Sequence, residues 1–275
     1  MDIIQAIIIG LVQGLTEFLP VSSSAHLIFI QHALGVGSNM AFDVILHAGT
    51  LVAVVAFFFK DIVLMIYAFI LSIKDLFTGK FIQGLREESY KRLVWYVIIG
   101  TIPIGLIGVI FNSTIESIFQ GINIPAFFLL ITGTLLYISQ RINPGKTKQE
   151  NLTLKESIIV GCGQAIAILP GLSRSGTTIA TGLTLGLDKE FAAKFSFLLC
   201  VPAILGAAVV EIKDLTLADA NLSAYIVGFI VAAISGYLAI KFLLQLIQKR
   251  NLDIFAYYCW IVGILILLGC LIFGW

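Results

Sequence analysis

Apolar residues dominate this chain in long runs that are separated by short polar connections. Six runs are long enough to cross a bilayer as helices of roughly 17–25 residues. They lie at 41–59, 93–111, 124–140, 195–212, 223–241 and 254–274. Two further regions, 1–34 and 157–187, are apolar but are interrupted in their middles by Gly, Pro and Ser. The pattern predicts six transmembrane helices and two broken segments.

The second half of the chain resembles the first half, segment by segment and in the same order. PAFFLLITGTLLYIS (125–139) matches FAYYCWIVGILILLG (255–269), and FLPVSSS (18–24) matches ILPGLSRSG (168–176). Two weaker matches pair WYVIIG with AYIVGF and FFFKD with VEIKD. Four matches in one order indicate a duplication. We expect a single membrane domain over 1–275, divided into a first repeat at about 1–141, which carries an inside insertion at 62–90, and a second repeat at about 155–275.

Each repeat would hold one broken segment and three spans, so the second repeat is expected to insert upside down relative to the first. The basic residues agree with this inverted topology. With the 60–92 connection inside the cell, 15 of the 17 Lys and Arg residues fall on inside connections, as the positive-inside rule requires. The exceptions are Lys213, which lies outside, and Arg174, which lies in the second broken segment.

If each broken segment enters and leaves the membrane on one side, the two tips meet near its middle. Irregular backbone at that depth is tolerated where protein or water satisfies its polar groups. Inverted repeats with discontinuous helices commonly place a binding site there. The alternative is that the broken segments are ordinary kinked spans. The fold class predicted here is an all-α integral membrane protein with an inverted-topology repeat, six transmembrane helices and two re-entrant helix-loop-helix segments.

Composition supports the membrane assignment and excludes some functions. Hydrophobic residues make up 59% of the 275 positions and charged residues 12%, against about 25% charged residues in soluble domains. The net charge of +1 argues against a nucleic-acid partner, which calls for a basic face. The N-terminus has no basic region or cleavage site of a removable signal peptide. The four cysteines are scattered, so neither a disulfide nor a zinc site is expected.

The first broken segment concentrates polar chemistry in QGLTEFLPVSSSAHL (13–27). Gln13 and Glu17 are four residues apart and share one helix face. Pro20 interrupts the helix, and at least one of the serines at 22–24 is expected to cap the next one. Capping explains neither Glu17 nor His26, because an apolar segment has no structural need for them. The other histidines are weaker candidates, with His47 expected to pack between helices and His32 to lie at the interface.

The second broken segment contains PGLSRSGTT (170–178), with two glycines, four hydroxyls and Arg174. An arginine within the membrane costs about 2.5–3.5 kcal/mol on insertion scales, so it needs a partner. One hypothesis is a purely structural ion pair between Glu17 and Arg174. The other is an anionic ligand, because a guanidinium suits phosphate oxygens and a restarting helix next to Gly and Ser offers backbone N–H groups.

These residue types together favour phosphoryl transfer. A hydroxyl would attack, Glu17 and His26 would move protons or hold a metal, and Arg174 would stabilise the developing charge. Histidine titrates near neutral pH, so His26 can act as acid or base. The rival is an inverted-repeat lipid or anion transporter or flippase, which would bind an anion without chemistry. A scaffold without a ligand leaves Glu17 and Arg174 unexplained.

At these motifs the chain resembles the undecaprenyl-diphosphate phosphatases, also called bacitracin-resistance proteins. The family signature (E/Q)xxxE corresponds to Gln13–Glu17, and PGxSRSxxT corresponds to Pro170–Thr178. FSFLLCVPA (195–203) is similar to the family's stretch after the second motif. The resemblance extends over essentially the whole chain. It implies a membrane enzyme that removes the terminal phosphate of undecaprenyl diphosphate, recycling the lipid carrier for peptidoglycan and other cell-wall polymers.

The resemblance also implies roles for individual residues. It makes Glu17, Ser23, His26 and Arg174 the catalytic core, while the substrate-binding set is Gln13, Ser22, Ser173, Ser175 and Thr178. Some members have Glu where this chain has Gln13, so Glu17 would be the main contact of a divalent metal, Mg or Ca, with Gln13 as a weaker one. We favour Ser23 as nucleophile with His26 as acid or base, and leave open attack by His26 or by a metal-activated water.

The same resemblance implies the setting of the protein. The expected partners are a polyprenyl diphosphate substrate and membrane lipids, and a homodimer is left open. The expected location is the bacterial cell (inner) membrane, with the active site facing outside.

Overall fold

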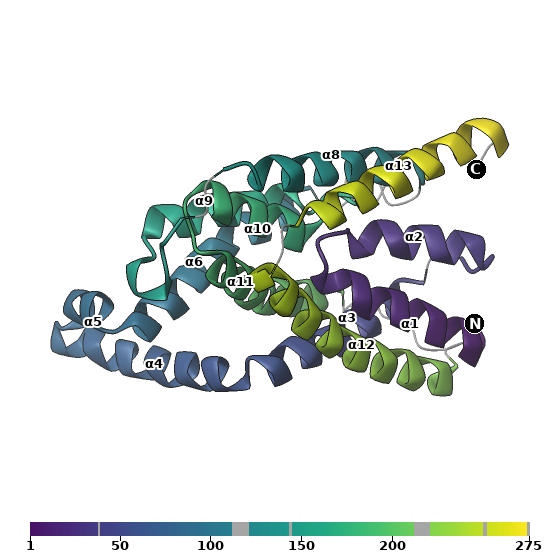
Figure 1. Ribbon diagram of the computed structural model, residues 1–275. Helices are drawn as coiled ribbons and strands as arrows, with labels where there is room; N and C mark the ends of the chain where they lie inside the picture. The colour runs from purple at the N-terminus through teal and green to yellow at the C-terminus, as the bar shows by residue number, and fades with distance from the viewer. Residues whose placement is uncertain (38, 112–120, 143–144, 212–220, 250–251, 274–275) are drawn as a thin grey trace.

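The computed structural model describes residues 1–275 except 38, 112–120, 143–144, 212–220, 250–251 and 274–275. The two connections expected outside the cell, with Lys213, lie largely outside the described residues. The described regular structure is helical, apart from one isolated bridge between Thr147 and Leu187. Both termini lie at one end of the molecule, and α4 and α5 lie at the other (Figure 1).

All six predicted spans are helices. They are α3 (Met40–Phe57), α6 (Ser89–Ile110), α8 (Asn123–Ser139), α11 (Lys189–Glu211), α12 (Leu222–Lys249) and α13 (Asp253–Phe273). Five of them are long and apolar enough to cross a membrane, and α8 has 17 residues, about 26 Å at 1.5 Å per residue. Large apolar side chains cover their outer faces, as Leu271 shows with 82% exposure. The protein is therefore a multi-pass membrane protein.

Both broken segments form helical hairpins. The first consists of α1 (Ile3–Phe18) and α2 (Ser23–Ala33), the second of α9 (Leu154–Ile166) and α10 (Arg174–Thr184). The two helices of each hairpin pack on one another. The α1–α2 hairpin lies at the end that holds both termini, and α9–α10 lies toward the opposite end (Figure 1). None of these helices reaches the usual length of a span, so the arrangement is re-entrant rather than a set of kinked spans.

Three helix pairings in one half of the molecule have a counterpart in the other, namely α1–α2 with α9–α10, α3–α12 with α11–α6, and α1–α12 with α9–α6. The hairpin helix α1 packs on α12, and α9 packs on α6. In both places two glycines bring the backbones together. A Cβ at Gly10 would lie 2.7 Å from the carbonyl oxygen of Gly228, and one at Gly161 would lie 2.1 Å from that of Gly100. Small residues permit such close helix contacts in membranes, and these contacts hold each hairpin against a long span.

The insertion between α3 and α6 is also helical, which the sequence pattern does not predict. It forms α4 (Phe59–Thr78) and α5 (Phe81–Glu87). Tyr67 and Ile70 of α4 are more than half exposed. Other residues of α4 border a wholly apolar crevice of about 250 Å³ between α4, α6 and α11. Lys91 of α6 binds Asp75 of α4 at 2.7 Å. Apolar packing and buried charge pairs therefore attach the insertion to the bundle.

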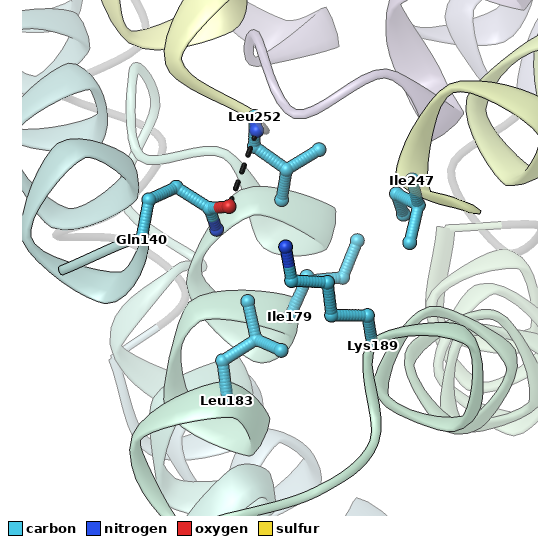
Figure 2. Close-up of a pocket in the computed structure, with 6 residues that line it drawn as sticks. All are labelled: Gln140, Ile179, Leu183, Lys189, Ile247 and Leu252. Carbon is cyan, nitrogen blue, oxygen red and sulfur yellow. Dashed lines mark hydrogen bonds between the residues drawn. The ribbon is translucent and has the colours of Figure 1, made fainter. Parts of the chain in front are cut away.

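A second crevice, between α8, α10, α11 and α12, is mostly apolar. Figure 2 shows Ile179 and Leu183 of α10 on one side and Ile247 on the other, with the side chain of Lys189 extending between them. The Gln140 side-chain oxygen accepts a hydrogen bond from the Leu252 backbone at 3.3 Å. This face of α10 is thus committed to packing, and the polar chemistry of α10 lies at its first turn.

Candidate active site

The first tip turns the chain between α1 and α2. Pro20 follows the end of α1, and Ser22 adopts a φ of 69°, which is unusual for a residue with a side chain. Ser22 is the N-cap of α2, and its hydroxyl accepts the Ala25 backbone N–H at 3.5 Å. Of the three serines that precede His26, Ser22 is therefore the cap, and Ser23 becomes the first residue of α2.

The second tip is fixed by its own cap and by α8. Ser173 is the N-cap of α10 and accepts the Gly176 backbone N–H at 3.0 Å. Thr132 of α8 donates to the carbonyl of Gly171 and accepts from the backbone of Ser173, both at 3.0 Å. Gly171 has a φ of 98°, a conformation that glycine adopts without strain. These contacts aim the first turn of α10 at the first tip.

The two tips touch one another. The Ser175 hydroxyl donates to the Leu19 carbonyl at 3.1 Å, and the Gly171 backbone donates to the Ser24 hydroxyl at 3.4 Å. Residues more than 140 positions apart are thereby brought into one cluster. The sequence prediction that the broken segments meet at their tips is confirmed.

Glu17 is the centre of this cluster, with only 6% of its surface exposed. One carboxylate oxygen pairs with Arg174 Nη2 at 2.5 Å. The other accepts from Ser23 Oγ at 2.6 Å and from Gln13 Nε2 at 3.0 Å. His47 Nε2 of α3 lies 3.8 Å from this second oxygen. From the sequence, we expect His47 only to pack between helices. The structure thus contains the Glu17–Arg174 pair, and it places a serine hydroxyl on the same carboxylate.

Several buried polar atoms in the hairpins lack a hydrogen-bond partner. They include Arg174 Nη1 and Gln13 Oε1 beside Glu17, and the side-chain amide of Gln164 and hydroxyl of Thr177 deeper in the second hairpin. Buried polar groups are nearly always paired with protein or water. Arg174 therefore retains donor capacity beyond its ion pair, which a purely structural pair would not require.

His26 has different partners. Its Nδ1 lies 2.8 Å from the Ser22 carbonyl oxygen, and its Nε2 lies 2.8 Å from the hydroxyl of Tyr258 in α13. The hydrogen bond of Ser23 goes to Glu17. Tyr258 lies in an apolar run and belongs to neither motif, so the sequence gives no signal for it.

The remaining predicted substrate contacts serve structure in this conformation. The Thr178 hydroxyl bonds to the Arg174 carbonyl at 2.7 Å and to Ser196 of α11 at 2.6 Å. Ser173 and Ser175 hydrogen-bond to each other at 3.2 Å, beyond their roles at the tips. These hydroxyls hold Arg174 and the first turn of α10 in place.

The residues at the site suit a metal ion that a diphosphate brings with it. Among the described residues, no group of three or more His, Cys, Asp and Glu gathers as a metal cage. Mg²⁺ is commonly bound through one or two carboxylates together with substrate phosphates and water. Glu17 would supply a carboxylate, and Oε1 of Gln13, which has no hydrogen-bond partner among the described residues, would supply a second oxygen.

The chain is similar to proteins of one family along nearly its whole length. The family model described as "Bacitracin resistance protein BacA" matches residues 6–265. A relative named undecaprenyl-diphosphatase from Methanobrevibacter smithii is 67% identical, with 98% of each chain covered. Relatives of the same name from Methanosphaera stadtmanae and Alkaliphilus metalliredigens are 49% and 43% identical, covering 96% and 99% of this chain and 97% and 100% of theirs. Since both the family model and these relatives match almost every helix described above, the chain belongs to the BacA bacitracin-resistance protein family.

Proposed function

We propose that this protein hydrolyses undecaprenyl diphosphate to undecaprenyl phosphate and inorganic phosphate. The observation that carries the proposal is the buried Nη1 of Arg174, which has no hydrogen-bond partner among the described residues and lies beside a serine–carboxylate pair. A guanidinium binds phosphate oxygens well, and a serine paired with a base is an activated nucleophile. The relatives named undecaprenyl-diphosphatase support the choice of substrate.

In the proposed reaction, Ser23 Oγ attacks the terminal phosphorus and the anhydride bond to the leaving undecaprenyl phosphate breaks. Glu17 Oε2, which accepts from Ser23 Oγ at 2.6 Å, takes the proton of the hydroxyl. Arg174 stabilises the charge on the transferring phosphoryl oxygens. Water then attacks the phosphoserine, with His26 accepting its proton. The bond between phosphorus and Ser23 Oγ breaks, Glu17 returns its proton to that oxygen, and inorganic phosphate leaves. In this mechanism Glu17 is the base for Ser23, and His26 is the base for water.

A divalent ion, Mg or Ca, would be held by Glu17 and Gln13 together with the diphosphate. It would supply positive charge that neutralises the phosphate oxygens. The prenyl chain would lie among the exposed apolar side chains of the bundle, in contact with membrane lipids. We place the protein in the cell (inner) membrane with the site open to the outside, where it would recycle the lipid carrier for cell-wall synthesis and confer bacitracin resistance, alone or as a homodimer.

The direct test is phosphate release from undecaprenyl diphosphate by protein purified in detergent with Mg²⁺ or Ca²⁺. Release by the wild type and none by Arg174→Ala is expected. A transporter would bind the lipid without releasing phosphate, so absence of release by the folded wild type would reject the phosphatase.

The orientation of the protein across the membrane can be tested separately. In a variant whose native cysteines are replaced, a cysteine at the exposed position Gly121 should react in intact cells with an impermeant thiol reagent. A cysteine at Glu87 in α5 should react only after the cells are permeabilised. The reverse pattern would place the site on the inner side.

A further inference from the structure

Tyr258 is joined to His26 across 232 residues of sequence. The two rings stack, with centroids 5.6 Å apart and planes 12° from parallel. The Tyr258 hydroxyl lies 2.8 Å from His26 Nε2. Tyr258 comes from α13, which carries neither motif, and this contact gives the helix a direct connection to the site.

The other ring nitrogen fixes the direction of this hydrogen bond. His26 Nδ1 lies 2.8 Å from the Ser22 carbonyl oxygen, and a carbonyl can only accept. Nδ1 therefore carries the hydrogen in the neutral ring, and Nε2 carries the lone pair. The Tyr258 hydroxyl must then donate to Nε2, so that the two partners select one tautomer.

The backbone at Ser22 is strained in the conformation that presents this carbonyl. Its φ of 69° with ψ of 94° lies in a region that residues with a side chain rarely occupy. In the described residues Ser22 is the only non-glycine residue with positive φ. Strain of this kind persists where the surrounding structure imposes it, often at functional sites.

We propose that Tyr258 is a positioning residue for His26. Together with the Ser22 carbonyl, it holds the imidazole in the Nδ1–H tautomer and so keeps the lone pair on Nε2. The attacking water then takes the place of the Tyr258 hydroxyl at Nε2 and gives its proton to that lone pair. The proposal rests on the proposed phosphatase activity. Among the described side chains, two rings contact the His26 ring: Tyr258, which is titratable, and Phe29, which is apolar and lies on the same helix with its ring centroid 6.1 Å away. Tyr258 is 41% exposed, so water and substrate can reach its side of the ring.

Tyr258→Phe is the informative variant, because it keeps the stacked ring and removes only the hydroxyl. Tyr257→Phe is the matched control, since Tyr257 neighbours Tyr258 on α13 but packs against Tyr137 and Trp260. We expect Tyr258→Phe to lower kcat by about 10²-fold, the effect of a small displacement of a catalytic group, and to leave KM unchanged. Tyr257→Phe should retain wild-type kcat.

A second measurement reports on the ring itself. The chain has three histidines, so ¹⁵N-imidazole NMR of the full protein in detergent can resolve them, with His26→Gln assigning the His26 signals. The wild type should show the Nδ1–H tautomer at His26. Tyr258→Phe should show mixed tautomers or a shifted Nε2 resonance, and Tyr257→Phe the wild-type spectrum.

The two measurements separate the possible failures. Unchanged His26 resonances in Tyr258→Phe would overturn the positioning role, as would unchanged kcat with altered resonances. Equal losses of kcat in both variants would also overturn it, because the effect would then not depend on the hydroxyl. If the wild type released no phosphate, the proposed function would fail while the NMR comparison still tested the contact between Tyr258 and His26.

Discussion

Removing one or both charges of the Glu17–Arg174 pair separates a structural role from a catalytic one. The pair is buried, with 4% of the Glu17 side chain and 17% of the Arg174 side chain exposed. Glu17→Gln would leave the guanidinium without a counter-charge, and Arg174→Gln would leave the carboxylate with Ser23, Gln13 and the more distant His47. Each single variant therefore strands a charge in a region of low polarity.

The expected loss of stability follows from that burial. Removing one partner of a buried ion pair costs about 3–5 kcal/mol, whereas replacing both with neutral groups is often close to neutral. Because Arg174 is partly exposed, we expect about 3 kcal/mol for each single variant, which corresponds to a fall of roughly 10 °C in the unfolding midpoint for a chain of this size. The double variant Glu17→Gln/Arg174→Gln should recover most of that loss.

Activity should not follow stability. If Arg174 binds the transferring phosphoryl group and Glu17 accepts the proton of Ser23, the double variant loses both functions and releases phosphate at least about 10³-fold more slowly than wild type. The assays are thermal unfolding in detergent and phosphate release below the unfolding midpoint. A double variant that regained both stability and activity would refute the catalytic assignment and leave a structural pair.

Three further predictions follow from the same geometry. Ser23→Ala should reduce phosphate release by at least about 10²-fold. Ser24→Ala, which removes contacts to the Ser22 hydroxyl and the Gly171 backbone but none to Glu17, should retain most of it; equal activity in both would remove Ser23 as nucleophile. Gly171→Ala should lower the unfolding midpoint, because the added Cβ would lie 2.2 Å from the Pro125 carbonyl oxygen and residue 171 has a φ of 98°. Overpacking together with backbone strain costs about 2–4 kcal/mol. An unchanged midpoint would show that α8 can move away from residue 171. EDTA should abolish release by the wild type and Mg²⁺ or Ca²⁺ should restore it, so full activity after exhaustive chelation would contradict a divalent ion at Glu17.

The membrane helices can be predicted from the sequence because each carries its own signal. A run of apolar residues of span length needs no knowledge of its neighbours, and all six runs become helices. The insertion at 62–90 lacks that signal because Lys60, Asp61, Lys74 and Asp75 flank its apolar stretch, yet it forms α4. The charges that hide α4 from a hydropathy pattern are neutralised by tertiary partners, such as Lys91 on Asp75 and Lys194 on Asp61.

The cluster at the candidate site is predictable only in part, because only some of its residues carry a signal of their own in the sequence. Glu17 and Arg174 stand out because charge within an apolar segment is costly, and the structure joins them. Thr132 and Tyr258 carry no such cost, since a hydroxyl in an apolar helix can bond to its own backbone or face lipid headgroups. Their roles arise from the packing of α8 and α13 against the tips, which is information about contacts between distant segments. The residue pattern alone also does not distinguish Ser22, Ser23 and Ser24, and the choice of Ser23 as nucleophile depends on the family resemblance.

The proposed duplication explains how one of these serines became available for chemistry. If the two hairpins descend from one repeat, the Leu-Pro pairs align Ser23 with Ser173 at an offset of 150. Ser173 is the N-cap of α10, and its hydroxyl is occupied by the backbone of Gly176. In the first hairpin the helix begins one residue earlier in this alignment, at Ser23, and Ser22 takes over the cap.

That shift of one residue is accompanied by the positive φ of Ser22, and it has two consequences. It frees the Ser23 hydroxyl to donate to Glu17, and it turns the Ser22 carbonyl toward His26. A relaxed turn like that before α10 would return Ser23 to capping and remove both contacts. Ser22→Gly should therefore relieve strain and raise the unfolding midpoint, because glycine tolerates φ of 69°, but it should lower phosphate release as the tip loses its fixed conformation. A variant that gained stability without losing activity would show that the strain at Ser22 does not serve the reaction.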